Sequence, residues 1–168
     1  LEKIFKKNKF DFIFNLAAQA GVRYSIEQPR KYIDTNINGF FNIIENAKKY
    51  KVKRLFYASS SSVYGENNNF PLNEKEKIYP KNIYSLTKKI NEELSSIYKN
   101  FYNVNSTGLR FFTVYGEWGR PDMMMLKFID AFFMKKKFEL FNFGNHYRDF
   151  TYIGDVVKIM GILLLNNK

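Results

Sequence analysis

The 168-residue sequence contains no cysteine and one histidine, His146. Without cysteine, the chain has neither disulfide bonds nor thiolate ligands for a metal ion. A single histidine needs several nearby carboxylates to complete a metal site, and the sequence around His146 does not supply them. We therefore expect no metal site.

Long apolar runs are also missing. The longest candidate, residues 162–165 (ILLL), is far shorter than the roughly 18 residues that cross a membrane. The sequence opens on a charged, helix-like stretch instead of a signal peptide. We expect a cytoplasmic protein with no membrane partner.

Acidic residues are scarce relative to basic ones, and the formal net charge is +11. Such an excess can indicate a nucleic-acid partner. The lysines are dispersed, however, and the two dense runs, 48–54 and 135–137, fall at expected helix ends, where cations suit the helix dipole. We expect no nucleic-acid partner and a surface that suits an anionic small molecule; nucleic-acid binding is the less favoured alternative.

What the chain has is enough apolar content for a core, 45% hydrophobic and 18% aromatic. Short apolar runs predict buried strands, and apolar residues three or four apart predict helices. The predicted strands are residues 10–16, 54–58, 104–112 and 138–141. The predicted helices are residues 32–50, 84–99, 123–135 and 155–165, and a polar surface loop covers 66–81. This alternation indicates an α/β fold with a parallel sheet.

Ligands of such sheets bind beyond the carboxyl ends of the strands. The segments expected there are residues 17–22, 59–62 and 113–115. The predicted helix 84–99 contributes a pair of residues that we expect near this edge. Tyr84 and Lys88 are four residues apart, so a helix brings the phenol and the ammonium to one face, where the cation favours the phenolate.

Five segments resemble one enzyme family. They are residues 16–25 (LAAQAGVRYS), 57–65 (YASSSSVYG), 108–116 (GLRFFTVYG), 118–123 (WGRPDM) and 148–153 (RDFTYI). Together with Tyr84 and Lys88 they resemble the extended short-chain dehydrogenases/reductases of the NAD-dependent epimerase/dehydratase family. Among these the sequence is most similar to UDP-glucuronate 4-epimerase. The resemblance runs from about residue 10 to residue 157 and implies a Rossmann-like, doubly wound parallel sheet.

The resemblance also implies catalytic roles. Tyr84 resembles the family's base and Lys88 the residue that binds the nicotinamide ribose and tunes the phenol. Ser60 resembles the hydroxyl that bonds the sugar 4-OH, with Ser61 as the alternative, whereas Ser59 is expected to be structural. In the implied mechanism the base removes the 4-OH proton and NAD takes the C4 hydride. The 4-keto sugar then turns and receives the hydride on its other face.

The expected cofactor is NAD. Besides Tyr84 and Lys88, the residues that the resemblance assigns to it are Leu16, Ala17, Ala18, Asn36 and Phe111. Asn36 either contacts the cofactor region or braces the active-site strands, and a helix cap is the structural alternative. Core packing alone would equally explain Phe111.

The residues expected to bind substrate are Ser61, Ser62, Thr113, Arg120 and Arg148. Sugar-nucleotide dehydratases have an Asp-Glu pair where Ser61 and Ser62 stand, and hydroxyls cannot do that acid/base work. Thr113 replaces the Asn of enzymes that epimerise UDP-galactose. Arg120 resembles the arginine associated with a substrate carboxylate, a surface ion pair being the alternative, and Arg148 is expected to meet the UDP diphosphate.

One family motif is absent: the sequence contains no Gly-x-x-Gly-x-x-Gly. In the family these glycines let the backbone approach the cofactor pyrophosphate. We therefore expect a partial NAD-binding domain whose N-terminal unit is missing and whose substrate lobe has only begun. Residues 1–120 are expected to form the sheet core, and residues 121–168 the start of the substrate-binding part.

These observations predict the core of an NAD-dependent UDP-glucuronate 4-epimerase that makes UDP-galacturonate. The alternatives are another UDP-sugar 4-epimerase, a UDP-glucuronate decarboxylase, or an inactive fragment that cannot hold NAD. The family resemblance further implies a homodimer in the full-length protein, formed through the helices around residues 40–47 and 90–97.

Overall fold

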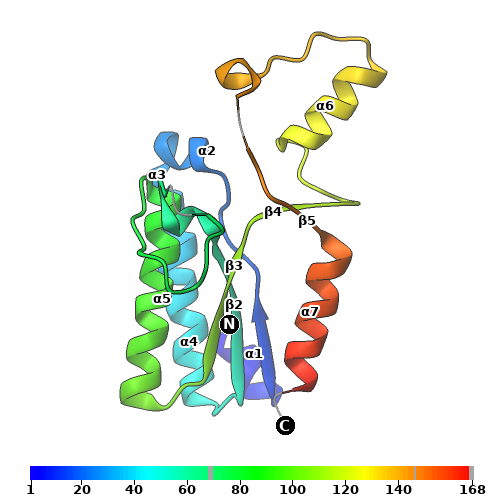
Figure 1. The fold of residues 1–168 in the computed structure, drawn as a ribbon. Helices are drawn as coiled ribbons and strands as arrows, with labels where there is room; N and C mark the ends of the chain where they lie inside the picture. Colours follow the sequence, from blue (N-terminus) through cyan, green and yellow to red (C-terminus); the bar gives the residue numbers. More distant parts are fainter. Residues whose placement is uncertain (68–69, 146, 167–168) are drawn as a thin grey trace. The chain divides into compact units, whose positions relative to one another are not determined.

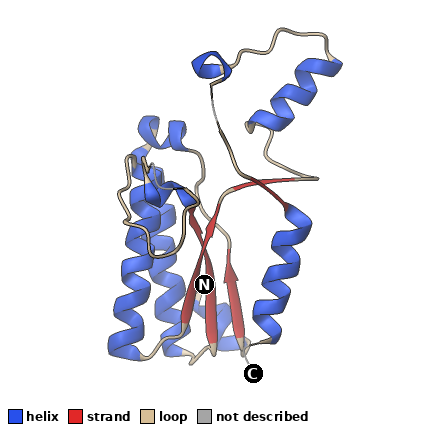
Figure 2. Cartoon of the chain, viewed as in Figure 1, coloured by secondary structure: helices blue, strands red, loops and turns tan. Residues whose placement is uncertain are grey.

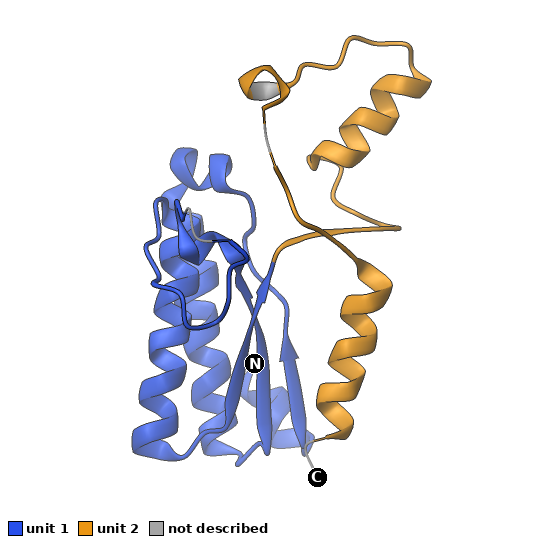
Figure 3. Cartoon of the chain, in the orientation of Figure 1, with its two compact units in different colours: residues 1–111 blue, residues 112–168 orange. Residues whose placement is uncertain are grey.

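The structure is a computed structural model that describes residues 1–67, 70–145 and 147–166 (Figures 1 and 2). His146 lies outside these residues. The chain forms two compact units, Leu1–Phe111 and Phe112–Lys168, which Figure 3 colours separately.

Three parallel strands form the sheet of the first unit, in the order β1-β2-β3: β1 (Phe12–Asn15), β2 (Arg54–Ser60) and β3 (Ser106–Phe111). The register pairs Asn15 with Tyr57 and Ser60 with Phe111. Because the strands all run the same way, their carboxyl ends lie at one edge of the sheet. The predicted parallel sheet and these three predicted strands are confirmed.

Helices α4 (Gly39–Lys49) and α5 (Ile83–Tyr102) pack against each other and against this sheet (Figure 1). Phe40 and Ile44 of α4 meet Leu55 and Tyr57 of β2 in one buried core, which Phe5 of α1 (Glu2–Lys7) joins. In α4 the apolar spacing that predicted the helix marks the buried face, since Phe40, Ile44 and Ala47 are buried. In α5 it does not, because Leu86 and Ile97 of the predicted apolar stripe are 39% and 48% exposed. The buried residues of α5 are mostly polar: Ser85, Thr87, Lys88, Asn91, Ser95 and Tyr98.

Helix α5 begins at a capping box that fixes where Tyr84 falls. The Asn82 side chain accepts a hydrogen bond from the Ser85 amide, and the Asn82 amide donates to Ser85 Oγ. These bonds satisfy amides that the first turn of a helix leaves without partners. The predicted helix 84–99 is therefore confirmed, with Tyr84 in its first turn.

The predicted helix 32–50 is confirmed as helical, but it does not begin as a regular α-helix. After α2 (Val22–Glu27) and α3 (Pro29–Tyr32), a π-helical segment, η1 (Ile33–Asn38), leads into α4. Such segments are rare and occur frequently at functional sites. The π turn carries Asn36, which is 1% exposed.

Beyond β2 the serine run turns into a short 3₁₀ helix, η2 (Ser61–Tyr64). The described residues between 65 and 81 contain neither helix nor strand, so the predicted loop is confirmed there. A loop without regular structure depends on its contacts with neighbouring elements for a defined position.

The second unit contains a two-stranded parallel ladder, β4 (Thr113–Tyr115) with β5 (Phe150–Tyr152). Thr113 lies opposite Phe150. Helices α6 (Met124–Phe133) and α7 (Ile153–Leu165) confirm the two helices predicted in this region. Strand β5 was not predicted because three residues are too short for a strand pattern.

The predicted strand 138–141 is wrong. Residues 136–140 have no regular structure, and a 3₁₀ helix, η3 (Phe141–Gly144), follows them. Phe138 packs edge-to-face against Phe128 of α6, with 5.5 Å between ring centroids. Its apolar character therefore serves contact with a helix, which a four-residue apolar run cannot reveal.

Candidate active site

Tyr84 and Lys88 lie together in the first two turns of α5. The Lys88 ammonium is 5.8 Å from the centroid of the Tyr84 ring. It also donates a 2.7 Å hydrogen bond to the carbonyl of Ala58 in β2. Lys88 is 3% exposed, and burial lowers the pKa of Lys88 from 10.5 to about 8.

Lys88 and Tyr84 have hydrogen-bonding groups that no described residue of the protein uses. An ammonium carries three donors, and among the described residues only the Ala58 carbonyl accepts one of them. Within the same part of the chain the Tyr84 hydroxyl makes no hydrogen bond. Two free donors on a buried cation fit the hydroxyls of a ribose, so the residues present are compatible with a bound dinucleotide.

Tyr84 is positioned by a buried polar chain. Asn36 donates to the Gln19 carbonyl and to Thr87 Oγ1, both at 3.0 Å, and accepts from the Gln19 amide at 2.7 Å. Thr87 Oγ1 in turn donates to the Tyr84 carbonyl at 2.7 Å. Asn36 therefore braces the loop after β1 against α5, and it is not a helix cap.

The ring of Tyr84 has a further support that sequence reasoning missed. Tyr32 contacts it edge-to-face, with 6.2 Å between centroids. The Tyr32 hydroxyl donates to the carbonyls of Ala20 and Gly21, at 2.8 and 2.6 Å. Tyr32 thus connects the Tyr84 ring to the loop after β1.

Residues predicted to bind the cofactor lie at the carboxyl edge of the sheet. Leu16, Ala17 and Ala18 directly follow β1 in a segment without regular structure, and Leu16 is 49% exposed. Phe111 is the last residue of β3 and lies opposite Ser60 of β2 in the ladder. The register therefore brings Phe111 beside the serine run.

Hydrogen bonds distinguish the serines. Ser60 Oγ accepts from the amide and the hydroxyl of Ser62, at 3.2 and 2.9 Å, and so caps η2. Both are accepted bonds, so the Ser60 hydrogen can still be donated. Ser59 is 2% exposed and bonds Glu92 of α5, in agreement with the structural role expected for it.

The other predicted substrate residues belong to the second unit. Arg120 donates two parallel bonds to the Asp122 carboxylate, at 2.9 and 2.7 Å, and lowers the pKa of Asp122. This is the ion pair that the alternative interpretation of Arg120 named, and both side chains are exposed. Arg148 donates to the Tyr147 carbonyl at 2.9 Å.

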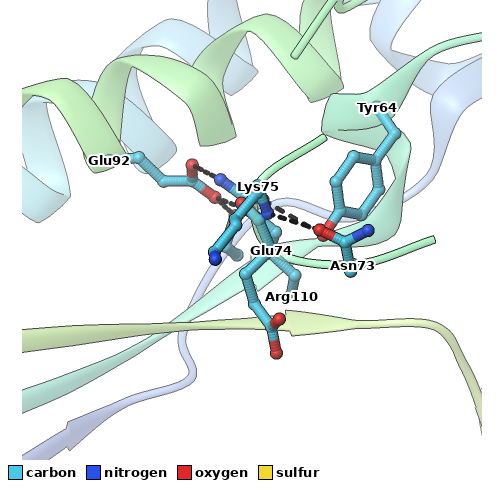
Figure 4. Close-up of polar contacts among 7 residues, drawn as sticks. Tyr64, Asn73, Glu74, Lys75, Glu92 and Arg110 are labelled. Atoms are coloured by element: carbon cyan, nitrogen blue, oxygen red, sulfur yellow. Dashed lines mark hydrogen bonds and ion pairs between the residues drawn. The ribbon is translucent and has the colours of Figure 1, made fainter. Parts of the chain in front are cut away.

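Sequence reasoning also missed Glu92 and Arg110, which form an ion pair (Figure 4). Glu92 also accepts a hydrogen bond from Ser59, the first residue of the serine run. Their signal was available, because Glu92 follows Lys88 by four residues and Arg110 lies inside one of the resembling segments.

Across the described part of the chain, no helix is long and apolar enough to span a bilayer. No group of three His, Asp or Glu side chains could hold a metal ion there either.

Comparison with known proteins identifies the family. The profile of the NAD dependent epimerase/dehydratase family matches residues 1–168. The chain belongs to this family. It is 49% identical to Protein CapI of Staphylococcus aureus, over 98% of this chain and 49% of that protein. It is 47% identical to UDP-glucuronate 4-epimerase 4 of Arabidopsis thaliana, over 94% of this chain and 37% of that protein.

Solved structures of family members confirm the Rossmann-like fold. A UDP-glucuronic acid 4-epimerase from Bacillus cereus, in complex with UDP-glucuronic acid and NAD, matches with a TM-score of 0.91 and 32% identity. The match covers 97% of this chain and 51% of that one. UDP-glucose 4-epimerase from Thermotoga maritima, with UDP-glucose, matches with a TM-score of 0.90 and 31% identity, over 94% and 52%. The chain thus spans about half the length of these epimerase structures.

Proposed function

We propose that this member of the NAD-dependent epimerase/dehydratase family forms the catalytic core of a UDP-sugar 4-epimerase that interconverts UDP-glucuronate and UDP-galacturonate. The observation that carries the proposal is the Tyr84–Lys88 pair. A buried ammonium with free donors lies beside a phenol whose hydroxyl has no partner among the described residues. The UDP-glucuronate 4-epimerases among its relatives support the substrate.

Tyr84 acts as the base in this proposal. The nearby Lys88 cation stabilises the phenolate that removes the proton of the sugar 4-OH, and the phenol returns the proton at the end of the cycle. Because Ser60 Oγ only accepts in its bonds with Ser62, it donates its own hydrogen to the sugar oxygen. Ser60 thereby orients the group that Tyr84 deprotonates.

NAD is held by Tyr84, Lys88 and the edge residues Leu16, Ala17, Ala18 and Phe111. When bound, it supplies the hydride acceptor and donor for the sugar C4. The free donors of Lys88 bind the ribose hydroxyls, and the small side chains after β1 let the backbone approach closely. Asn36 has its amide groups bonded to Gln19 and Thr87, so we assign it to bracing this edge.

The substrate carboxylate is assigned to Arg120, whose planar fork suits two parallel bonds. Asp122 receives such a pair of bonds in the structure and would have to exchange with the substrate. Ser61 and Ser62 contribute hydroxyls to the sugar pocket and lack the carboxyls of a dehydratase. Thr113 and Arg148 are also assigned to the substrate, Arg148 to its diphosphate.

The substrate is tested with a full-length version of the enzyme, in which these residues are joined to the parts that its relatives have. NMR should show UDP-galacturonate after UDP-glucuronate is added. A UDP-pentose would indicate a decarboxylase, and turnover of UDP-galactose alone would contradict the carboxylate role of Arg120. Arg120→Met should raise KM for UDP-glucuronate about 10–100-fold, because it removes a charge-assisted bidentate contact with the substrate carboxylate.

A second candidate is a binding or structural piece without activity. It is favoured by the absence of a Gly-x-x-Gly-x-x-Gly motif from these 168 residues. This candidate concerns the 168-residue chain alone, and calorimetric titration of NAD into that chain tests it. We expect no micromolar binding by this chain, because no glycine loop holds the pyrophosphate; micromolar affinity would remove the reason for this candidate.

A further inference from the structure

Arg110 and Glu92 form an ion pair outside the proposed proton-transfer site (Figure 4). Glu92 lies one helical turn beyond Lys88 in α5. Arg110 of β3 donates two parallel bonds to Glu92 of α5, from Nε at 3.0 Å and from Nη2 at 2.8 Å. The two side chains are only 19% and 16% exposed. A bidentate pair shielded from water is more directional than an exposed one. Removing either partner would leave the other as an unpaired, shielded charge.

The pair connects three other segments. Ser59, near the end of β2, donates to the Glu92 carboxylate. Arg110 Nη1 donates to the Tyr64 hydroxyl in η2 at 3.0 Å and to the Glu74 carbonyl in the following loop at 3.2 Å. The guanidinium also lies 4.9 Å from the centroid of the Tyr64 ring. One ion pair therefore holds β2, η2 and the loop together.

The segment held in this way is the serine run. Residues 60–62 lie between Ser59 and Tyr64, and both of these bond to the ion pair. On the helix side, Lys88 bonds Ala58 and Glu92 bonds Ser59. Two residues one helical turn apart on α5 therefore hold two neighbouring residues of β2. The position of Ser60 relative to Tyr84 thus depends on both attachments.

We propose that the Arg110–Glu92 pair positions the serine run for the proton transfer at Tyr84, an inference that rests on the proposed function. The described loop residues 70–81 have no helix or strand, and a backbone hydrogen bond joins them to η2, from the Tyr79 amide to the Val63 carbonyl at 2.9 Å. A displacement of about 1 Å at a reacting group can reduce a rate about 100-fold.

Two variants remove parts of the cluster. Arg110→Lys keeps the positive charge but cannot bond Glu92, Tyr64 and the Glu74 carbonyl together. Tyr64→Phe is the milder change, because it removes only the hydroxyl that accepts from Arg110. The matched control is Arg30→Lys, which alters the exposed pair between Arg30 and Asp34, 3.6 Å apart.

Two measurements are needed. Amide hydrogen exchange of the 168-residue chain should be about 10-fold faster at residues 61–64 and 74–79 in Arg110→Lys, with a smaller change in Tyr64→Phe and none in the control. In the full-length version, kcat should fall about 10–100-fold while KM changes less than about 3-fold, as expected for lost positioning.

The outcomes separate this inference from the proposed function. If wild type shows no epimerase activity, the proposed function fails, and unchanged exchange in both variants would overturn the positioning of the serine run as well. In an active enzyme, faster exchange with unchanged kcat would mean that the pair serves stability alone. A lower kcat with unchanged exchange would show that Arg110 acts by another route. Either result overturns the inference.

Discussion

Lys88 carries its charge in an environment that penalises it. The side chain is 3% exposed, and burial lowers its pKa from 10.5 to about 8. A buried lysine is costly for stability near neutral pH, and its hydrogen bond to the Ala58 carbonyl offsets only part of that cost. Because a lysine in this position costs stability, its place beside a phenol is better explained by a role in the proposed reaction than by a contribution to stability.

The first prediction concerns the pH dependence of stability. Below pH 8 Lys88 is protonated in both folded and unfolded chains, whereas between about pH 8 and 10.5 only the unfolded chain retains the proton. The free energy of unfolding of wild type should therefore rise with pH in that window relative to Lys88→Met, by about 3 kcal/mol in total. Urea unfolding of both proteins at several pH values measures this difference.

The control for this experiment is Lys99→Met, which removes an exposed lysine from the other end of α5. It corrects for the loss of one positive charge. If wild type and Lys88→Met kept a constant difference across the window, Lys88 would titrate as an ordinary surface lysine and the buried-cation account would be wrong.

At the scale of elements, the π-helical segment η1 has a clear consequence. It carries Asn36, which bonds both backbone groups of Gln19 and the hydroxyl of Thr87. These bonds join the loop after β1 to α5. The loop carries the proposed cofactor residues, and α5 carries Tyr84. Asn36 therefore holds the proposed cofactor edge together with Tyr32, which bonds the Ala20 and Gly21 carbonyls of the same loop.

The second prediction follows from these bonds. Asn36→Ala should lower the free energy of unfolding by about 2–4 kcal/mol, because it removes a buried amide that bonds both backbone groups of Gln19 and the hydroxyl of Thr87. Asn38→Ala, which removes an exposed side chain bonded to Asp34 at 3.3 Å, should cost less than about 0.5 kcal/mol. Denaturant unfolding compares them, and equal losses would contradict the bracing role.

Elements with long apolar patterns could be predicted from the sequence, and short or irregular ones could not. The helix at 84–99 and the strands at 54–58 and 104–112 were predictable because their apolar residues recur over many positions. The π turn at η1 depends on the bonds of Asn36 to distant residues, which no local pattern encodes. The strand predicted at 138–141 failed because Phe138 packs on α6.

At the scale of the whole molecule, the exposed faces of α4 and α5 carry large apolar side chains. Phe41 of α4 is 44% exposed, and Ile97 and Phe101 of α5 are 48% and 78% exposed. Apolar groups gathered on two packed helices are a common basis of self-association. They are consistent with the homodimer expected from the family resemblance.

The third prediction tests that dimer. The wild-type protein should sediment as a dimer, and Ile97→Lys should sediment as a monomer because a charge is buried at the interface. Ile26→Lys changes an isoleucine on α2 that is 71% exposed, and it should remain a dimer. A monomeric wild type, or a dimeric Ile97→Lys, would show that these helices are not the interface.

The site was predictable to the extent that its residues lie in motifs. Tyr84, Lys88 and the serine run could be named from spacing and resemblance, and the parallel register brings Ser60 beside Phe111 as the carboxyl-edge rule requires. Their partners could not be named, because the Ala58 carbonyl, Thr87 and Glu92 act through tertiary contacts. For Arg120 the sequence left two interpretations open, a contact with the substrate carboxylate and a surface ion pair such as the one with Asp122.

The most direct test of the account is the removal of one oxygen. In the full-length version, Tyr84→Phe should lower the rate of UDP-glucuronate epimerisation by about 100-fold or more, because it removes the base and little else. Tyr102→Phe, at the far end of the same helix, should leave the rate unchanged. NMR detection of UDP-galacturonate measures both rates, and a Tyr84→Phe enzyme with full activity would contradict the central claim.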